Sequence, residues 1–311
     1  MARYPQSTAE LDGAERRWWS ENGDLEHDYC WVQTPPVQRL LRGGYLRTVT
    51  ELVDPASSVL ELGCGTGWFS LLLASMGVSN VVGVDFSPDQ IAQARLGAKE
   101  AGLEERVHFE VADGSDTRKR VKFDLVVMHA FLHHLATDEV RSAVDQACDH
   151  LVDGGRLVVV EPVHFPGATV REPATLRALR LLEGLPRRLH DMGRRPMGQR
   201  ESEVRGRLAI RHSGEAPFGP SPKEMPFGPG ELDELLAPHF SIDVRRRCIC
   251  MSHLVAQELL IAGLSQPKLW RVLRLPILVL ARTLDGLLMR RGTLPSTVWA
   301  FQLFVCTKRG A

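Results

Sequence analysis

Several features that would indicate a metal framework, a membrane protein or a nucleic-acid-binding protein are missing from this chain of 311 residues. The 38 Lys and Arg residues are balanced by 38 Asp and Glu residues, so net charge provides no attraction to nucleic acid. The six cysteines include no C-x-x-C pair, which supports neither a zinc site nor a disulfide framework and favours a reducing cytoplasm. The chain has no uninterrupted apolar run of about 18 residues, so the sequence predicts no membrane span. The first six residues lack the apolar core of a signal peptide.

One stretch organises the rest of the chain. Val59–Leu62 predicts a short buried strand, and it is followed by glycines at every second position, Gly63, Gly65 and Gly67, and by a helix that begins near Trp68. Glycine permits positive φ and lets the backbone approach a ligand closely. The helix start directs free N–H groups and a partial positive charge at the turn. A G-x-G-x-G run alone also fits a purely structural turn or a dinucleotide site, so the neighbouring residues must decide.

Two carboxylates distinguish these alternatives. Glu61 stands just before the glycines, and Asp85 ends the next predicted strand, 81–85. A carboxylate at the C-terminal end of this next strand suits a ribose diol. A carboxylate beside the turn would repel a pyrophosphate but suits a ligand with an amino group, and the spacing departs from the G-x-G-x-x-G of phosphate-binding turns. Both observations favour S-adenosylmethionine (SAM), a sulfonium with an α-amino group and no phosphate.

The residues from Glu61 to Gly67, together with Asp85, closely resemble the SAM motifs of class I methyltransferases. The resemblance covers about 59–161 and the last strands, and it is specific for cofactor and fold rather than for substrate. It implies an α/β fold: a doubly wound, mostly parallel seven-stranded sheet with an antiparallel last strand and helical cap insertions. It also implies SAM as cofactor, with S-adenosylhomocysteine as its product. The cofactor-binding residues that it implies are Tyr29, Glu61, Gly63, Gly65, Asp85, Phe86, Asp113, Gly114 and His129. Asp113 would accept a hydrogen bond from the adenine amino group, unless it only caps the next segment.

The order of the predicted elements fits such a sheet, because strands and helices alternate. Ser87 as N-cap, Pro88 at the first position and Gln90 closing a capping box predict the start of the second helix. Further strands are expected at 107–111, 123–128, 156–161, 240–250 and 297–306, and helices at 68–76, 88–101, 137–153 and 231–236.

The chain divides into regions around this core. We expect an N-terminal helical lid at 1–50, the SAM-binding core at 51–161, a cap insertion at 162–230, and the C-terminal part of the core at 231–311 with a helical insertion at 252–295. The aromatic residues of the first region either pack on the sheet or cover the cofactor, with Tyr29 the nearest to it.

Both insertions leave alternatives open. Eight arginines between 187 and 211 either form a solvated flap or recognise an anionic group of the substrate. The apolar run 269–282 either packs on the core, covers a substrate tunnel, forms a homodimer contact or lies on a membrane surface.

Histidines follow the fourth strand: His129, His133 and His134. A histidine can take a proton from a hydroxyl as a methyl group is transferred. Glu161 ends the fifth strand, and could orient a protonated histidine as the third group of a triad does. This pattern resembles that of small-molecule O-methyltransferases acting on glycosides and related natural products. We predict His133, His134 and Glu161 as catalytic, with His133 the preferred base. A packing role for one histidine stays open, and so does a three-histidine metal site, which neighbours in sequence rarely form.

The sequence therefore predicts a SAM-dependent methyltransferase that acts on a small, partly apolar metabolite, most favourably on oxygen and without a metal. A C- or N-methyltransferase acting on a lipid-like or anionic small molecule is the alternative. The balanced charge disfavours an RNA or protein substrate. The glycine spacing and Glu61 disfavour a nicotinamide oxidoreductase, and the intact motif disfavours a scaffold that has lost cofactor binding.

Overall fold

The computed structural model describes residues 9–22, 45–112, 121–164, 221–223, 225, 227–249, 275–284 and 299–310. Seven strands form one sheet in the order β3-β2-β1-β4-β5-β7-β6. The first five strands are mutually parallel, and β7 runs antiparallel to both β5 and β6. The bounds are Ser58–Leu62 for β1, Asn80–Asp85 for β2, Val107–Val111 for β3, Phe123–His129 for β4, Leu151–His164 for β5, Phe240–Ile249 for β6 and Trp299–Lys308 for β7. The expected doubly wound α/β sheet with an antiparallel last strand is confirmed.

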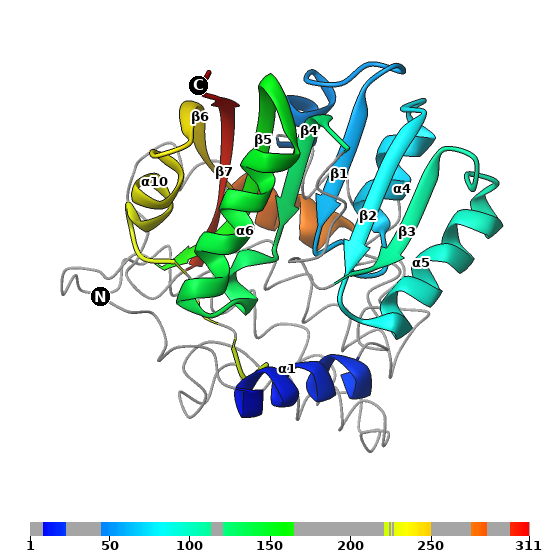
Figure 1. The fold of residues 1–311 in the computed structure, drawn as a ribbon, viewed down its shortest axis with the longest axis horizontal. Helices are drawn as coiled ribbons and strands as arrows, with labels where there is room; N and C mark the ends of the chain where they lie inside the picture. Colours follow the sequence, from blue (N-terminus) through cyan, green and yellow to red (C-terminus); the bar gives the residue numbers. More distant parts are fainter. Residues whose placement is uncertain are drawn as a thin grey trace.

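Helices cover both faces of this sheet (Figure 1). Helix α4 (Trp68–Ser75), helix α5 (Pro88–Ala101) and a helical turn at 45–50 pack on one face, and their apolar residues share one core cluster with Val59 and Val127. Helix α6 (Thr137–His150) and helix α10 (Glu231–Leu236) cover the other face and share a second cluster with strand residues such as Leu60. The sheet is thus buried on both sides, as its nearly continuous apolar strands require.

The start of α5 shows how a local signal also shapes the site. Ser87 Oγ accepts a hydrogen bond from the Gln90 N–H at 3.4 Å, and Pro88 occupies the first position, as predicted. The Ser87 N–H, however, donates to Asp85 Oδ1 at 2.9 Å, so the reciprocal half of the capping box is taken by Asp85 instead of Gln90. The cap therefore ties the end of β2 to the start of α5.

The predicted boundary between α6 and β5 is wrong by several residues. The helix was expected to reach 153 and the strand to begin at 156, but α6 ends at His150 and β5 begins at Leu151. Leu151 is fully buried and pairs with Phe123, so burial extends the strand. Gly154, with φ of 73°, then turns the chain before the regular ladder resumes at Arg156.

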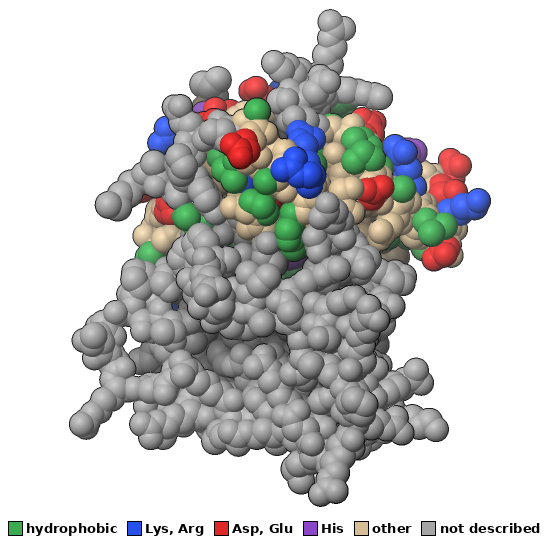
Figure 2. Space-filling view, turned by 90° about the horizontal axis from the view of Figure 1, so that it is seen from below, with side chains coloured by type: hydrophobic (Ala, Val, Ile, Leu, Met, Phe, Trp, Pro, Cys, Tyr) green, Lys and Arg blue, Asp and Glu red, His purple; other side chains and the backbone are tan. Residues whose placement is uncertain are grey.

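Because β1 to β5 are parallel, their carboxyl ends meet at one edge of the sheet. Helix α1 (Ala9–Asn22) lies across that edge, at the bottom of Figure 1. Seen from that side, the described surface carries acidic, basic and apolar side chains intermingled (Figure 2). Among the described residues, no helix has the length and apolarity needed to cross a membrane.

Candidate active site

The glycine turn forms a backbone cradle at the end of β1. Gly63, Gly65 and Gly67 have φ of 70°, 53° and 77°, in the left-handed region that side chains disfavour. The N–H groups of Gly63 and Cys64 both donate to the Val84 carbonyl, at 2.9 and 3.0 Å. A Cβ at Gly63 would lie 2.2 Å from the Phe131 ring. The turn therefore requires glycine both for its backbone angle and for its closeness to the loop after β4.

The two predicted cofactor carboxylates flank this turn and help to build it. Glu61 is buried, and its Oε2 accepts from the Ser70 N–H at 3.0 Å and from the Ser70 hydroxyl. Asp85 is also buried, and its Oδ2 accepts from the Gly65 N–H at 3.0 Å while Oδ1 accepts from the Ser87 N–H. Both carboxylates are thus oriented by main-chain donors before any ligand arrives.

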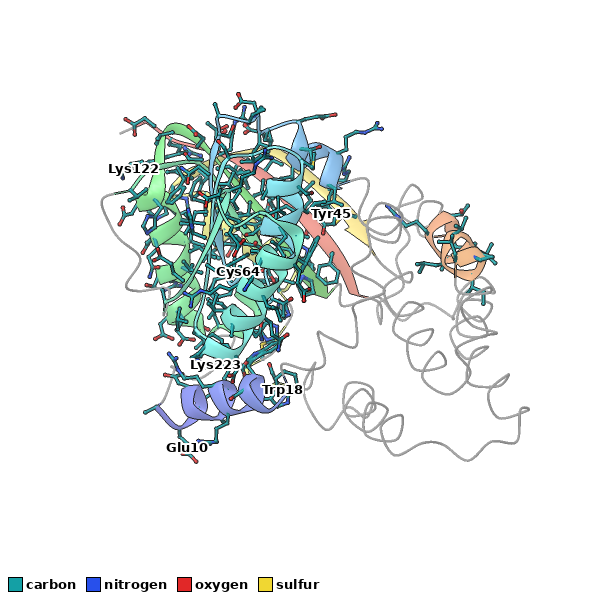
Figure 3. All side chains as sticks on the ribbon, turned by 90° about the vertical axis from the view of Figure 1, so that its right-hand side faces the viewer. Glu10, Trp18, Tyr45, Cys64, Lys122 and Lys223 are labelled. Atoms are coloured by element: carbon teal, nitrogen blue, oxygen red, sulfur yellow. The ribbon has the colours of Figure 1, made fainter. Side chains whose placement is uncertain are left out.

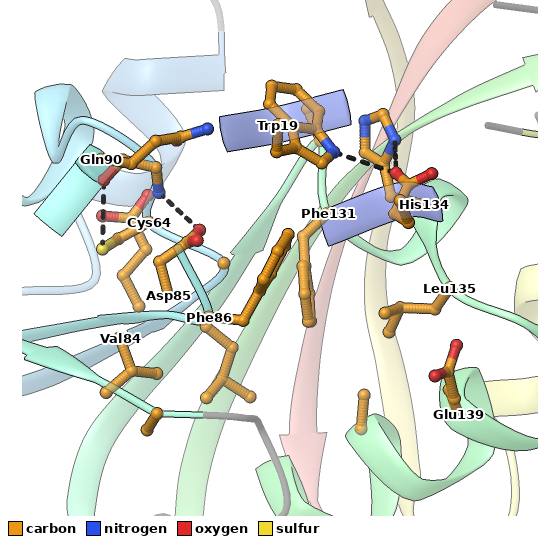
Figure 4. A pocket seen from close by; sticks show the side chains of 18 of the residues that line it. Trp19, Cys64, Val84, Asp85, Phe86, Gln90, Phe131, His134, Leu135 and Glu139 are labelled. Atoms are coloured by element: carbon orange, nitrogen blue, oxygen red, sulfur yellow. Dashed lines mark hydrogen bonds and ion pairs between the residues drawn. The ribbon is translucent and has the colours of Figure 1, made fainter. Parts of the chain in front are cut away.

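A cavity of about 350 Å³ opens beside the turn. Ligand sites commonly have volumes of about 300 to 1,000 Å³. Figure 4 shows Phe86 and Phe131 lying between the Asp85 side of the cavity and His134. The structure brings together at its lining seven of the predicted site residues: Glu61, Gly63, Gly65, Asp85, Phe86, His129 and His134. Tyr29, Asp113, Gly114 and the arginines between 187 and 211 lie outside the described residues.

His129 is positioned by an aromatic cage at the end of β4. Its Nε2 lies 2.9 Å from the Tyr45 hydroxyl, and its ring stacks on those of Tyr45 and Phe69. The edge of Trp68 completes the cage, with ring centroids 5.2 Å apart. Packing and hydrogen bonding therefore fix this histidine against the cavity wall.

His133 and Glu161 form the close pair that their positions after β4 and within β5 predict. His133 Nδ1 lies 2.7 Å from Glu161 Oε2, and both side chains are buried. Glu161 Oε1 accepts from the N–H groups of Phe131 and Leu132, at 2.8 and 2.7 Å. The carboxylate thus shapes the loop after β4 as well as orienting the imidazole. His133 is not among the described residues that line the cavity.

His134, the next residue, does line the cavity, and its contacts come from elsewhere in the chain. Its Nδ1 lies 3.0 Å from Ser221 Oγ and 3.5 Å from Glu15 Oε1. The Trp19 ring meets the His134 ring edge-on, with centroids 5.1 Å apart. Helix α1 therefore contributes directly to the wall beside this histidine.

Sequence reasoning missed two buried charged residues at this wall, Glu15 and Lys223. Glu15 stands four residues before Trp19, a spacing that places both on one helix face and that could have indicated it. Lys223 lies in a segment rich in Pro and Gly that gives no periodic signal. Lys223 Nζ contacts Asp12 of α1 at 2.6 Å and both carboxylate oxygens of Glu139 on α6, at 2.8 and 2.7 Å.

The described residues fit SAM as a ligand. The turn requires glycine where a backbone must approach closely, and two oriented carboxylates face the cavity where an amino group and a diol need acceptors. Among the described buried side-chain N and O atoms, Gln146 Oε1 alone has no hydrogen-bond partner, and Gln146 lines the cavity. His, Cys, Asp and Glu side chains in the described ranges form no group of three or more that could hold a metal ion.

Comparison with known proteins points to the same cofactor. Residues 59–155 match a family model described as a methyltransferase domain. The ubiquinone biosynthesis O-methyltransferase of Shewanella pealeana is 29% identical over 189 residues, which are 60% of this chain and 74% of the relative. The protein of the same name from Cronobacter sakazakii is 30% identical over 152 residues, 48% of this chain and 57% of the relative.

Solved structures share the fold at low identity. The [4+2]-cyclase SpnF has a TM-score of 0.51 and 18% identity, over 86% of this chain and 82% of the cyclase. The cyclopropane synthase MmaA2 from Mycobacterium tuberculosis has a TM-score of 0.52 and 16% identity, over 86% of this chain and 83% of the synthase.

The sheet order, the glycine turn and the two carboxylates beside it, Glu61 and Asp85, are typical of a SAM-binding α/β enzyme. With the matched family model and the related methyltransferases, they identify the chain as a class I SAM-dependent methyltransferase.

Proposed function

We propose that this methyltransferase transfers the SAM methyl group to an oxygen of a small, partly apolar molecule. The observation that carries this proposal is the pairing of His133 with buried Glu161, beside a cavity that His134 lines. An oxygen nucleophile gives up a proton when it is methylated, and a histidine oriented by a carboxylate is suited to accept it. The related proteins named O-methyltransferases support the same acceptor.

When bound, SAM supplies an electrophilic methyl group whose bond to sulfur breaks, leaving its electron pair on sulfur, as the acceptor oxygen forms the new C–O bond. The protein positions the acceptor in line with that bond, which contributes most of the rate. Glu61 and Asp85, already held by Ser70, Gly65 and Ser87, would provide acceptors for the amino group and the ribose.

His133 is the proposed base. With its Nδ1–H donated to Glu161, Nε2 is the basic nitrogen of the ring. The negative charge of Glu161 stabilises the imidazolium that forms when the hydroxyl proton arrives. The proton later leaves to solvent, so the overall change is an alcohol or phenol converted to its methyl ether, with release of one proton.

Parts of the wider hypothesis stay predictions. The cytoplasmic location is supported by the four described cysteines, which are not in disulfides. A C- or N-methylated product, a peripheral membrane contact, a homodimer and recognition of an anionic group by the 187–211 arginines are not required by the proposal. The lid role of the N-terminal region is supported by the contacts of α1 with the cavity wall.

Isotope transfer tests the proposal. The full chain would be incubated with methyl-labelled SAM and a panel of simple phenols, alcohols, carboxylates, amines and activated carbon acids, with products identified by mass spectrometry. We expect label in a methyl ether or ester. His133→Ala should lower turnover about 10²-fold or more, with little change in SAM affinity.

Glu161→Gln should also slow turnover, and the double variant should lose less than the sum of the two effects because the residues act as a unit. His239→Ala is the matched control, since that histidine is partly exposed, pairs with Asp145 and does not line the cavity. Near-full activity in both His133→Ala and His134→Ala would show that proximity alone suffices, and the preference for oxygen would be wrong.

A further inference from the structure

Two neighbouring histidines beside the cavity each have their own carboxylate. His133 pairs with Glu161 of β5, whereas His134 faces Glu15 of α1. The two imidazole rings are tilted against one another, with centroids 4.0 Å apart. Two charges so close oppose each other, so the surroundings must favour the charged form of one ring over that of the other.

Glu15 is an unusual residue for a helix that lies at the edge of a domain. It is buried, and it accepts hydrogen bonds from Trp19 Nε1 and from the Lys223 main-chain N–H, both at 2.9 Å. Burial alone would raise the pKa of Glu15, but the hydrogen bond and charge of His134, with the donors at Lys223 and Ser221, hold that pKa below its ordinary value. Glu15 therefore stays ionised next to His134.

The position of Glu15 depends on a polar contact between three segments. Lys223 lies between α1 and the rest of the domain (Figure 3) and pairs with Asp12 of α1 and Glu139 of α6. Burial opposes the charge on Lys223, but its hydrogen bonds to these two carboxylates raise its pKa above the ordinary value. The carboxylate of Glu15 is thus brought to His134 only when α1 is docked.

We propose that Glu15 is a positioning residue that keeps His134 as an imidazolium at the cavity wall, where His134 donates a hydrogen bond to the acceptor group of the substrate. This inference rests on the proposed methyl transfer to oxygen. As an imidazolium, His134 donates its Nδ1–H to Ser221 Oγ, 3.0 Å away, and Glu15 Oε1 lies 3.5 Å from the same nitrogen. The other charged residues that line the same cavity as His134 come from α1, α6 and the 221–223 segment: Asp12, Glu15, Arg16, Glu139 and Lys223.

The proposal divides the chemistry between the two rings. A donor at the acceptor oxygen favours the ionised form of that oxygen, which makes it a better nucleophile. His133, beside Glu161, then takes the proton as the base. Environments that separate the titrations of two adjacent groups are how enzymes assign acid and base roles. The site is complete only with α1 in place, so α1 supplies a functional group and does not merely cover the cofactor.

The first experiment needs no methyl acceptor. The full chain with isotope-labelled histidine and bound S-adenosylhomocysteine would be titrated by NMR, and His134 assigned by the signal missing from His134→Asn. Glu15→Gln should lower the titration midpoint of His134 by about 1 pH unit or more, because an opposite charge within a few ångströms is removed. Glu10→Gln is the matched control: Glu10 is exposed on the same helix and points away from the domain in Figure 3. A His134 midpoint equal in wild type and Glu15→Gln would overturn the proposal.

The second experiment uses the acceptor identified by isotope transfer. The pH profile of turnover should be bell-shaped, with an alkaline limb set by loss of the His134 proton. In Glu15→Gln that limb should move to lower pH and turnover at neutral pH should fall at least about tenfold, while Glu15→Asp should recover part of the loss. Asp12→Asn removes one partner of Lys223 and weakens the docking of α1, but it leaves the Glu15 carboxylate in the chain. It should therefore raise the KM for SAM, while at saturating SAM, with the helix docked, the alkaline limb should stay in place.

The two proposals fail in different ways. Label found on nitrogen or carbon instead of oxygen would contradict the proposed function, and the NMR titration would still judge the Glu15–His134 pair. An NMR shift in Glu15→Gln with an unchanged pH profile on an oxygen acceptor would overturn the positioning role alone. Identical pH profiles in Glu15→Gln and Asp12→Asn would show that Glu15 acts only by docking the helix, and would also overturn it.

Discussion

At the scale of single residues, Asp85 contacts both the glycine turn and the cavity, and substituting it tests its part in cofactor binding. It accepts a hydrogen bond from the Gly65 N–H of the glycine turn, and it lines the cavity, where we propose that it also accepts from the ribose. Asp85→Ala should weaken SAM and S-adenosylhomocysteine binding by about 1.5 to 3 kcal/mol, the usual value of a hydrogen bond to a charged group. Calorimetry measures this, with Glu104→Ala, at an exposed carboxylate, as the control. Unchanged affinity in a folded Asp85→Ala protein would contradict the assignment.

A pair of glycines separates backbone strain from steric conflict. Gly63 and Gly102 have nearly the same positive φ, 70° and 64°, but a Cβ at Gly102 would meet nothing within 4 Å, whereas at Gly63 it would meet Phe131. Gly102→Ala should cost only about 1 to 2 kcal/mol of stability, from the left-handed angle. Gly63→Ala should cost more and also abolish SAM binding. Thermal unfolding and calorimetry on both variants check this, and equal losses of stability would show that Phe131 can move aside freely.

The site residues that could be predicted from the sequence are those whose signals are local. Gly63, Glu61 and Asp85 are adjacent to, or one strand away from, a recognisable turn, and the sheet then brings them to the same edge. His133 and Glu161 come together because β4 and β5 are neighbours and parallel. Glu15 and Lys223 reach the site from 208 positions apart, through docking of a helix and a loop that no local pattern specifies. Nor does a local pattern tell the adjacent His133 and His134 apart: in the described residues, His134 lines the cavity and His133 pairs with Glu161.

At the scale of elements, the α6–β5 boundary and the docking of α1 depend on burial and charge. Pattern reasoning placed the start of α6 at Thr137 correctly, because its acidic first turn is a local signal. The end of α6 was misplaced because Asp153, Gly154 and Gly155 are typical of a helix stop but lie inside the strand, where Leu151 is buried against Phe123. Strand pairing thus overrides a local stop signal.

Docking of α1 should depend on pH, with losses at both extremes. The pKa of Glu15 is lowered in the folded protein, so its contribution is present above its unfolded value of about 4.3 and is lost as the pH falls through the lowered pKa. The pKa of Lys223 is raised, so its contribution is present below about 10.4 and is lost as the pH rises through the raised pKa. We therefore expect α1 to be docked most firmly between about pH 5 and 10.

Hydrogen exchange along the chain measures this docking. After correction for the intrinsic pH dependence of exchange, the amides of α1 should exchange faster at about pH 3 than at about pH 6. The central strand β1 is the internal control, because its slow exchange shows that the domain remains folded. Equal protection of α1 at both pH values would mean that apolar packing, with Trp18 and Trp19, holds the helix without help from Glu15.

At the scale of the whole molecule, the cavity proposed to hold the cofactor is lined by residues from the core clusters on both faces of the sheet. The glycine turn continues into α4 on one face, and the loop after β4 continues into α6 on the other. A ligand that contacts both the turn and the wall near α6 therefore connects the two core clusters. Binding to the folded state alone should stabilise the entire domain rather than one helix.

Another prediction uses this linkage to separate the methyltransferase from the nicotinamide alternative. A ligand present at 100 times its dissociation constant stabilises the folded state by about 2.7 kcal/mol. For a chain of this size, that should raise the midpoint of thermal unfolding by a few degrees, because the shift per kcal/mol becomes smaller as the chain becomes longer. SAM and S-adenosylhomocysteine should both produce this rise, and Asp85→Ala should reduce it. NADH at the same concentration should leave the midpoint unchanged, because Glu61 stands where a pyrophosphate would require positive charge or free N–H groups. A rise with NADH that matches the rise with SAM would contradict the cofactor assignment.

The same measurement tests the prediction that no metal is needed. Extensive treatment with a chelator should alter neither the SAM-induced rise nor turnover. Activity that vanishes with EDTA and returns with Mg²⁺ or Zn²⁺ would contradict the metal-independent chemistry.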